Sequence, residues 1–387
     1  MLKFSKQSID KSDIKAVNKV LNSEYLTQGP KTNEFEKRLK QFAGAKYSIA
    51  VNSASSALLI SCMALGLQKK DIIWTVPNTF AASANSILLS GQKLDFVDID
   101  KDTWNISLEN LKKKLLIAKS KKKLPKALIV VHLAGLPADP IEIKKLAQKY
   151  KFFIIEDASH SIGAKYYNKK VGSCYWSDLC VFSFHPVKII TTGEGGSVLT
   201  NNKKFYERML LFKNNGITKN SKKFKNKVLG PWYYEQQVIG YNFRMSDIQA
   251  ALGINQLKRI SKMLKKRNDI AKIYRKKLNN LPLNFQQIRK NFYSSYHLFI
   301  IKLHTDNANL HKKLFIFLRK NNIFVNLHYM PLHLNPYYKK FGYKKGNFPN
   351  SEDYGKKALS IPIFPDLKKN EQLKVINLLK KFFNVKK

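Results

Sequence analysis

The sequence contains no long apolar run and few cysteines. No uninterrupted stretch approaches the roughly 20 apolar residues that a membrane span needs, and residues 1–6 lack the apolar segment of a secretory signal. The three cysteines, Cys62, Cys174 and Cys180, form no CxxC pair, which argues against a disulfide framework and against a zinc site. We therefore expect a cytoplasmic protein in a reducing compartment, with no membrane contact and no bound metal.

Acidic residues and arginines are also scarce. Lysine and arginine together number 70 against 26 aspartates and glutamates, a formal net charge of +44, yet only eight of the basic residues are arginine. The lysines are spread over most helix-like segments instead of forming one stripe, and no known nucleic-acid-binding module is present. We attribute the charge to a general lysine bias and expect no specific nucleic-acid partner, although anionic substrates would be attracted in a salt-dependent way.

Most of the chain alternates short apolar runs with segments of helical periodicity. Continuously apolar strands that alternate with helices indicate a mostly parallel sheet that is covered on both faces. Because 387 residues exceed one ordinary core, we predict a large α/β domain over 1–255 and a smaller α+β domain over 256–387. The predicted strands are 47–51, 72–77, 94–99, 127–133, 152–157, 179–186 and 198–200 in the large domain, and 299–303 and 324–326 in the small one. A helix is predicted from 248 to about 264, and a loop is predicted from the end of the helical segment 205–212 to Gly230.

One lysine differs from the others in its surroundings. Lys188 follows the apolar run that begins at Leu179, and Val187 and Ile189 flank it directly. A lysine that is desolvated among apolar neighbours loses preference for its charged form, so its pKa falls and its amine becomes a usable nucleophile. The residues by themselves leave open whether Lys188 is such a nucleophile or an ordinary surface lysine on a turn.

Polar side chains follow two further predicted strands. The turn Ser53-Ala54-Ser55 lies between a strand and a helix, where free backbone N–H groups and hydroxyls could hold a phosphate, although ordinary serine capping is the alternative. Asp157 ends another strand, and His160 follows it. Because ligands of parallel sheets lie beyond the carboxyl ends of the strands, we expect these groups and Lys188 to converge on one crevice.

A cofactor with a phosphate, a ring nitrogen and an aldehyde would need all of these groups, and pyridoxal 5′-phosphate (PLP) has that chemistry. Lys188 would hold it covalently, Asp157 would pair with the ring nitrogen, and Ser183 would join the serine turn in binding the phosphate. Phe80 could stack on the ring and His160 could approach the ring hydroxyl, but Phe80 could instead be core packing and His160 a structural histidine.

Five motifs, in order over nearly the whole chain, resemble those of the sugar-nucleotide aminotransferases of PLP fold type I. They lie at 52–58, 156–161, 183–188, 193–196 and 240–247. The resemblance implies the aspartate aminotransferase-like fold and a PLP-dependent transamination in which Lys188, Asp157 and His160 are the catalytic residues. It also implies a homodimer with the active site at the interface, where Asn242 reaches the partner's cofactor.

The loops at 25–29 and 325–338 are most similar to the branch of this family that acts in pseudaminic acid synthesis. That resemblance implies transfer of an amino group from L-glutamate to C4 of a UDP-linked 4-keto-6-deoxy-N-acetylhexosamine. The implied substrate contacts are Tyr25, Thr27, His185, His328 and Tyr329. Three alternatives remain open: an aminotransferase for another nucleotide-linked keto sugar (perosamine-type or C3), a catalytically inactive PLP-fold binding protein, and a charge-driven nucleic-acid binder.

Overall fold

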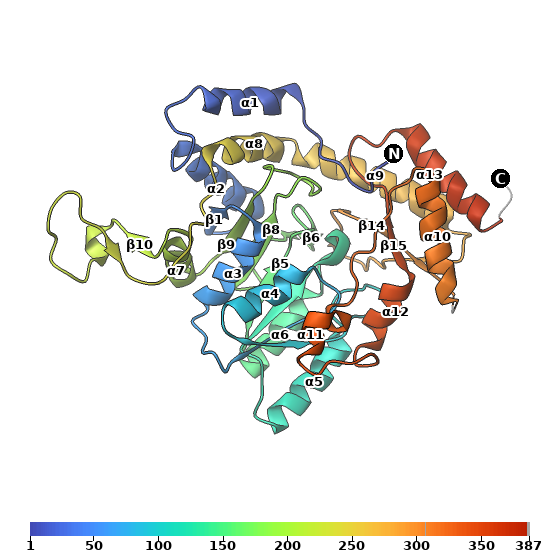
Figure 1. The fold of residues 1–387 in the computed structure, drawn as a ribbon, viewed down its shortest axis with the longest axis horizontal. Coiled ribbons are helices and arrows are strands. Elements are labelled where there is room, and N and C mark those ends of the chain that lie inside the picture. The colour runs from blue at the N-terminus through green and yellow to red at the C-terminus, as the bar shows by residue number, and fades with distance from the viewer. Residues whose placement is uncertain (306, 385–387) are drawn as a thin grey trace.

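A seven-stranded sheet forms the centre of the protein in a computed structural model, which describes residues 1–305 and 307–384 (Figure 1). Its strand order is β1-β9-β8-β5-β4-β2-β3, and β9 runs antiparallel to both of its neighbours while the other pairs are parallel. The predicted mostly parallel α/β sheet is therefore confirmed. The strands are β1 (Tyr47–Val51), β2 (Ile72–Thr75), β3 (Lys93–Phe96), β4 (Ala127–Val131), β5 (Phe153–Asp157), β8 (Leu179–Ser183) and β9 (Gly196–Thr200).

Helices cover both faces of this sheet because successive strand residues point to opposite sides and both sets are apolar. Ile129, Ile155 and Val181 pack on one face against α3, α4 and α7. Val130 and Ile154 pack on the other face against α5 and α6, and residues from β1, β8 and β9 pack there against α2 and α8. These helices are α2 (Pro30–Ala43), α3 (Ala54–Ala64), α4 (Ala81–Leu89), α5 (Leu108–Ser120), α6 (Pro140–Tyr150), α7 (Lys203–Lys213) and α8 (Asp247–Lys258).

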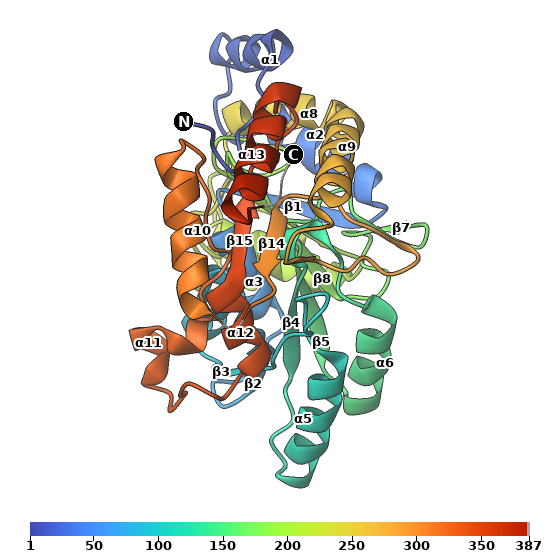
Figure 2. The same ribbon diagram turned by 90° about the vertical axis from the view of Figure 1, so that its right-hand side faces the viewer.

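The C-terminal part forms a separate antiparallel sheet with its own core on the right of Figure 1 and facing the viewer in Figure 2. Its strands are β12 (Leu283–Phe285), β14 (Phe299–Leu303) and β15 (Ala358–Ile361). Its helices are α9 (Ile260–Leu278), α10 (Ala308–Lys320), α11 (Pro336–Lys339), α12 (Pro349–Lys357) and α13 (Lys369–Phe382). The division predicted at 255–256 falls inside α8, and it stays a prediction.

The remaining elements lie outside these two cores. Helix α1 (Lys11–Leu21) lies along α8, and β10 (Ile217–Thr218) with β11 (Glu235–Gln236) forms an arm that projects from the body (Figure 1). A small sheet contains β6 (Lys165–Tyr166), β7 (Lys169–Lys170) and β13 (Phe292–Tyr293), and 3₁₀ turns occur at Leu133–Gly135, Ser221–Lys223 and Leu332–Leu334. Within 1–305 and 307–384, no helix combines the length and apolar character that crossing a bilayer would require.

Three local predictions were wrong. The single helix predicted from 248 to 264 is interrupted at Arg259, whose backbone leaves the helical geometry where α8 ends. The strand predicted at 324–326 is reduced to an isolated bridge between Asn326 and Ser360. The stretch before Gly230, predicted as a loop, contains β10 and a 3₁₀ turn. In each case, tertiary contacts outweighed a weak local pattern.

Candidate active site

The strand registers bring the predicted polar groups to one edge of the central sheet. Asp157 ends β5 and lies opposite Val181 on β8, and Ser183 ends β8 opposite Gly196 on β9. Gly196 in turn lies opposite Val51, the last residue of β1, two residues before Ser53. The convergence of these residues at one edge of the sheet, predicted from the strand order, is therefore present in the structure, and the role of each residue stays a prediction.

Lys188 lies at this edge of the sheet, on a tight turn after β8. The backbone N–H of Lys188 donates to the His185 carbonyl at 2.8 Å, and its amine forms no hydrogen bond or ion pair within the described part of the chain. Burial lowers the pKa of Lys188 to about 8, and the nearby Asp157 carboxylate opposes that lowering. A substantial neutral fraction of the amine near neutral pH is what a nucleophilic lysine requires.

The turn at the start of α3 is shaped to receive an anion. The Ser53 hydroxyl caps the helix by accepting from the Ser56 N–H at 3.1 Å, whereas the N–H groups of Ala54 and Ser55 donate to no acceptor in residues 1–305 and 307–384. A Cβ atom at Gly196 would lie 2.6 Å from the Ala54 nitrogen, so only glycine permits this close packing of β9 beneath the turn. Free N–H groups at a helix N-terminus form a phosphate-binding arrangement.

Asp157 is held in place by two serines. Its Oδ2 accepts from the Ser83 hydroxyl at 2.6 Å, and its Oδ1 accepts from the Ser159 hydroxyl at 2.6 Å. The side chain is buried, and these two bonds fix its orientation. Sequence reasoning missed Ser83. It lies three residues after Phe80, close to one helical turn, and that spacing was the available signal.

His160 is buried between two aromatic side chains. Its Nδ1 accepts from the Ala134 N–H at 3.3 Å, so its Nε2 carries the proton and faces the Tyr329 hydroxyl at 3.1 Å. The ring of His297, which sequence reasoning missed, lies 4.4 Å away between centroids. Burial, and after it the charge of Lys188, holds the pKa of His160 well below its usual value, so the imidazole is neutral.

The C-terminal part contributes His328 and Tyr329 to the same site. The Nδ1 of His328 lies 2.8 Å from the Ser360 hydroxyl, and burial, followed by the charge of Lys188, lowers the pKa of His328 to about 3. The ring of Tyr329 lies 5.9 Å from that of Phe80. Phe80 is 59% exposed, so it is not a core residue and its ring is available to a ligand.

The other predicted residues lie apart from this cluster. Tyr25, Asn242 and His185 are exposed, and Thr27 pairs with Ser246. The His185 carbonyl accepts from the backbone N–H of Lys188, but within residues 1–305 and 307–384 the side chains of these four residues form no hydrogen bond, ion pair or ring contact with Lys188, Asp157 or His160. Any contribution that these side chains make to chemistry at Lys188 therefore requires a ligand or a second chain.

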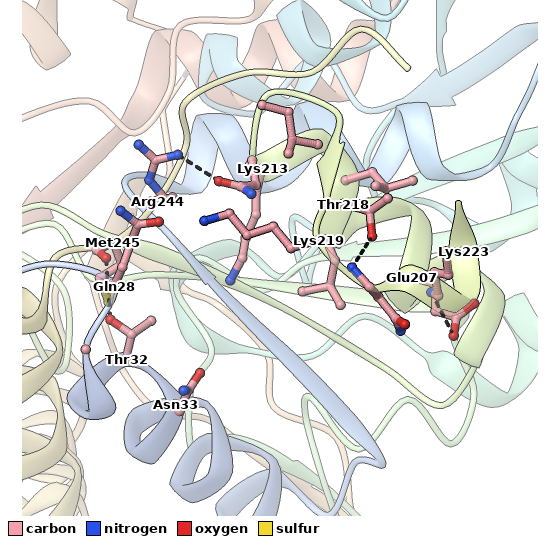
Figure 3. A pocket seen from close by; sticks show the side chains of 16 residues that line it. Gln28, Thr32, Asn33, Glu207, Lys213, Thr218, Lys219, Lys223, Arg244 and Met245 are labelled. Atoms are coloured by element: carbon pink, nitrogen blue, oxygen red, sulfur yellow. Dashed lines mark hydrogen bonds and ion pairs between the residues drawn. The ribbon is translucent and has the colours of Figure 1, made fainter. Parts of the chain in front are cut away.

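A hollow of about 390 Å³, lined by residues of α2, of α7 and of the stretch that follows α7, contains several cationic side chains (Figure 3). The backbone of Arg244 pairs with Val51 at the edge of β1, so this hollow adjoins the serine turn. Lys213 is paired with Glu36 at 2.9 Å and Arg244 donates to Asn214 at 2.7 Å. The cations that line it are Lys213, Lys219, Lys223 and Arg244.

The residues present fit PLP at each of its three functional groups. The free N–H groups of Ala54 and Ser55 suit the phosphate, the buried Asp157 carboxylate suits a protonated ring nitrogen, and the unpaired amine of Lys188 suits the aldehyde. The exposed ring of Phe80 offers a stacking surface beside them.

Comparisons with known proteins agree with this chemistry. Residues 7–380 match the profile of the DegT/DnrJ/EryC1/StrS aminotransferase family. The chain is 40% identical over 369 residues to a UDP-4-amino-4,6-dideoxy-N-acetyl-beta-L-altrosamine transaminase of Campylobacter jejuni, covering 95% of this chain and 93% of that protein. It is 31% identical to a GDP-perosamine synthase of Escherichia coli O157:H7, covering 96% of this chain and 95% of that one.

A solved structure with a similar fold is Helicobacter pylori PseC, an aminotransferase involved in the biosynthesis of pseudaminic acid. The two chains superpose with a TM-score of 0.91 at 32% identity, over 99% of each. The profile match extends over almost the entire chain, and several relatives exceed 30% identity over nearly their full length. The protein therefore belongs to the DegT/DnrJ/EryC1/StrS aminotransferase family, and it is a PLP-dependent sugar aminotransferase.

Proposed function

We propose that the protein transfers the amino group of L-glutamate to C4 of a UDP-linked 4-keto-6-deoxy-N-acetylhexosamine, giving UDP-4-amino-4,6-dideoxy-N-acetyl-β-L-altrosamine. The observation that carries the amino transfer is the convergence of Lys188, Asp157 and the Ser53 turn at one sheet edge. The choice of sugar is supported by 40% identity to the Campylobacter transaminase, against 31% to the perosamine synthase. We place the reaction in the cytoplasm, as the three free cysteines suggest.

We assign separate roles in this reaction to Lys188, Asp157 and His160. PLP, when bound, supplies a carbonyl that takes up amino groups and a ring that accepts electron density. Lys188 would hold the cofactor through its amine, and the same amine, when free, would act as the general base toward the proton on the amino-bearing carbon of the donor. Asp157, oriented by Ser83, would face the ring nitrogen and keep it protonated. Neutral His160 offers its Nε2 proton without adding a second positive charge beside Lys188.

The experiment that tests the function is a substrate panel with matched variants. Protein loaded with PLP is given glutamate and UDP-, TDP- or GDP-linked 4-keto sugars, and the product stereochemistry is read by NMR. We expect turnover of the UDP-linked N-acetyl sugar, loss of turnover and of borohydride-fixed cofactor in Lys188→Ala, and parent behaviour in Lys119→Ala, which changes an exposed lysine on α5. Turnover of the GDP-linked sugar alone would instead support a perosamine-type enzyme.

We also propose that the enzyme works as a homodimer with an active site at the interface. Two observations support this. Asn242 is exposed, and within the described residues it forms no hydrogen bond with Lys188 of its own chain. The projecting arm also carries large exposed apolar side chains, among them Leu229 (74%), Trp232 (77%) and Ile239 (80%), which a second chain would cover.

Hybrid dimers test this arrangement. Lys188→Ala and Asn242→Ala are each expected to be impaired, but a mixed dimer would contain one complete site. Random subunit exchange should therefore restore about a quarter of the parent activity, because half of the dimers are hybrids with one intact site of two. A mixture that shows only the average activity of the two variants would count against a shared site.

A further inference from the structure

The N-terminal segment, residues 2–5, lies among the C-terminal elements, and the N label stands near α10 and α13 in both views (Figures 1 and 2). Leu2 pairs with the stretch that follows α10: its N–H donates to the Asn322 carbonyl at 2.8 Å, and its carbonyl accepts from the Phe324 N–H at 2.8 Å. The Phe4 carbonyl accepts from the Ile363 N–H at 2.9 Å. Residues 2–4 are thus a fixed part of the C-terminal core.

The next residue leaves that core and bonds to the lysine turn. Ser5 is 3% exposed, and its hydroxyl donates to the Val187 carbonyl at 2.9 Å, across 182 residues of sequence. The Val187 carbonyl and the Lys188 N–H belong to one peptide unit, and the N–H end of that unit donates to the His185 carbonyl at 2.8 Å. Because the unit is held at both ends, its plane is fixed, and with it the direction in which the Lys188 side chain leaves the backbone.

The same segment contacts the predicted substrate loop. The ring of Phe4 lies 5.0 Å from that of His328, the histidine whose pKa is lowered in part by the charge of Lys188. Phe4 and Ser5 are neighbours in sequence, so the loop carrying His328 and the turn carrying Lys188 are joined through two consecutive residues.

We propose that Ser5 is a positioning residue for Lys188, and that residues 2–5 couple the 325–338 loop to the lysine turn. The proposal rests on the proposed function in one respect, namely that Lys188 is the residue that holds PLP. Nothing in the local sequence around Ser5 indicates this role, because its partner is far away in the chain.

The test compares Ser5→Ala with Ser8→Ala. Both remove one serine hydroxyl from the stretch before α1, but the Ser8 hydroxyl makes no hydrogen bond in residues 1–305 and 307–384. Loss of one buried hydrogen bond, about 1 kcal/mol, corresponds to roughly a fivefold change. We expect Ser5→Ala to weaken PLP binding to the apo-protein about fivefold, and to accelerate amide hydrogen exchange by a similar factor in a peptide covering 184–190.

Hydrogen exchange of the apo-protein needs no cofactor, so it measures the stability of the lysine turn whether or not the proposed transamination is correct. If Lys188→Ala still binds PLP covalently, the proposed function fails while the exchange result for Ser5→Ala stands. If Ser5→Ala matches Ser8→Ala in both exchange and PLP affinity, the positioning role is overturned. Equal acceleration of exchange across the whole chain would also overturn it, because Ser5 would then stabilise the fold in general.

Discussion

The low pKa of the Lys188 amine allows a quantitative prediction of how fast this amine reacts with an electrophile. With a pKa of about 8, roughly a quarter of this amine is neutral at pH 7.5, against about one part in a thousand for a lysine with the ordinary value of 10.5. Because only the neutral amine attacks an electrophile, the reactive fraction of Lys188 exceeds that of an ordinary lysine roughly 200-fold. This difference arises from burial and persists in spite of the neighbouring Asp157.

The assay is competitive labelling of the apo-protein. Trace acetic anhydride is added at a series of pH values, and the acetylated fraction of each lysine peptide is measured by mass spectrometry. We expect the labelling of Lys188 to rise with pH and to reach half its maximum near pH 8. The exposed lysine run 121–123 provides an internal reference, and comparing midpoints instead of absolute rates removes the effect of unequal access.

A variant sharpens the same prediction. The Asp157 carboxylate raises the pKa of Lys188, so Asp157→Asn should move the labelling midpoint to lower pH while weakening PLP binding. A Lys188 midpoint near 10 in the parent, or a shift to higher pH in Asp157→Asn, would refute the reasoning.

Three further changes have expected outcomes. Gly196→Ala places a Cβ against the backbone of the Ser53 turn, so PLP affinity should fall at least tenfold in a titration of apo-protein, with little change in far-UV circular dichroism. Tyr329→Phe removes the hydroxyl beside Nε2 of His160, and we expect about a tenfold slower half-reaction with glutamate in stopped-flow kinetics, corresponding to about 1.4 kcal/mol. Glu352→Gln weakens a buried pair with His333, and urea unfolding should show a loss of about 1–3 kcal/mol. Burial raises the pKa of Glu352, but hydrogen bonds, first that from His333, outweigh burial and hold the pKa below its usual value. The stabilisation from the charged Glu352 is therefore present at pH 7 and is lost as pH falls below about 4.5. Glu352→Gln should not show this acid-dependent loss of stability.

Much of the molecule could be predicted from local patterns. Short, continuously apolar runs such as 127–131 and 179–183 indicate strands that are buried on both faces. Because helices alternate with these strands along the chain, the strands are expected to pair in parallel. Parallel strands end at the same edge, so the positions of Asp157, Ser183 and Lys188 after their strands were enough to predict one crevice. The same residues carried the resemblance to the aminotransferase family, which the comparisons confirm.

Tertiary structure alone decided which side chains support those groups. Ser83 reaches Asp157 across 74 residues, and Ser5 reaches the Val187 carbonyl across 182. Serine occurs in many kinds of local structure, and a single long-range hydrogen bond produces no repeating pattern in the sequence. Such partners become visible only when distant segments are packed together.

The pairing of short strands also depends on tertiary contacts. The stretch 324–326 has strand-like composition, but its pairing is divided: Leu2 pairs with Ile323 and Ser360 pairs with Asn326, each as an isolated bridge. The sequence by itself therefore determined the sheet, the crevice and the chemical groups of the site, because these follow from period and strand direction. Only the tertiary structure decided how Lys188, Asp157 and His160 are held, because the energies involved are single long-range contacts of about 1 kcal/mol each.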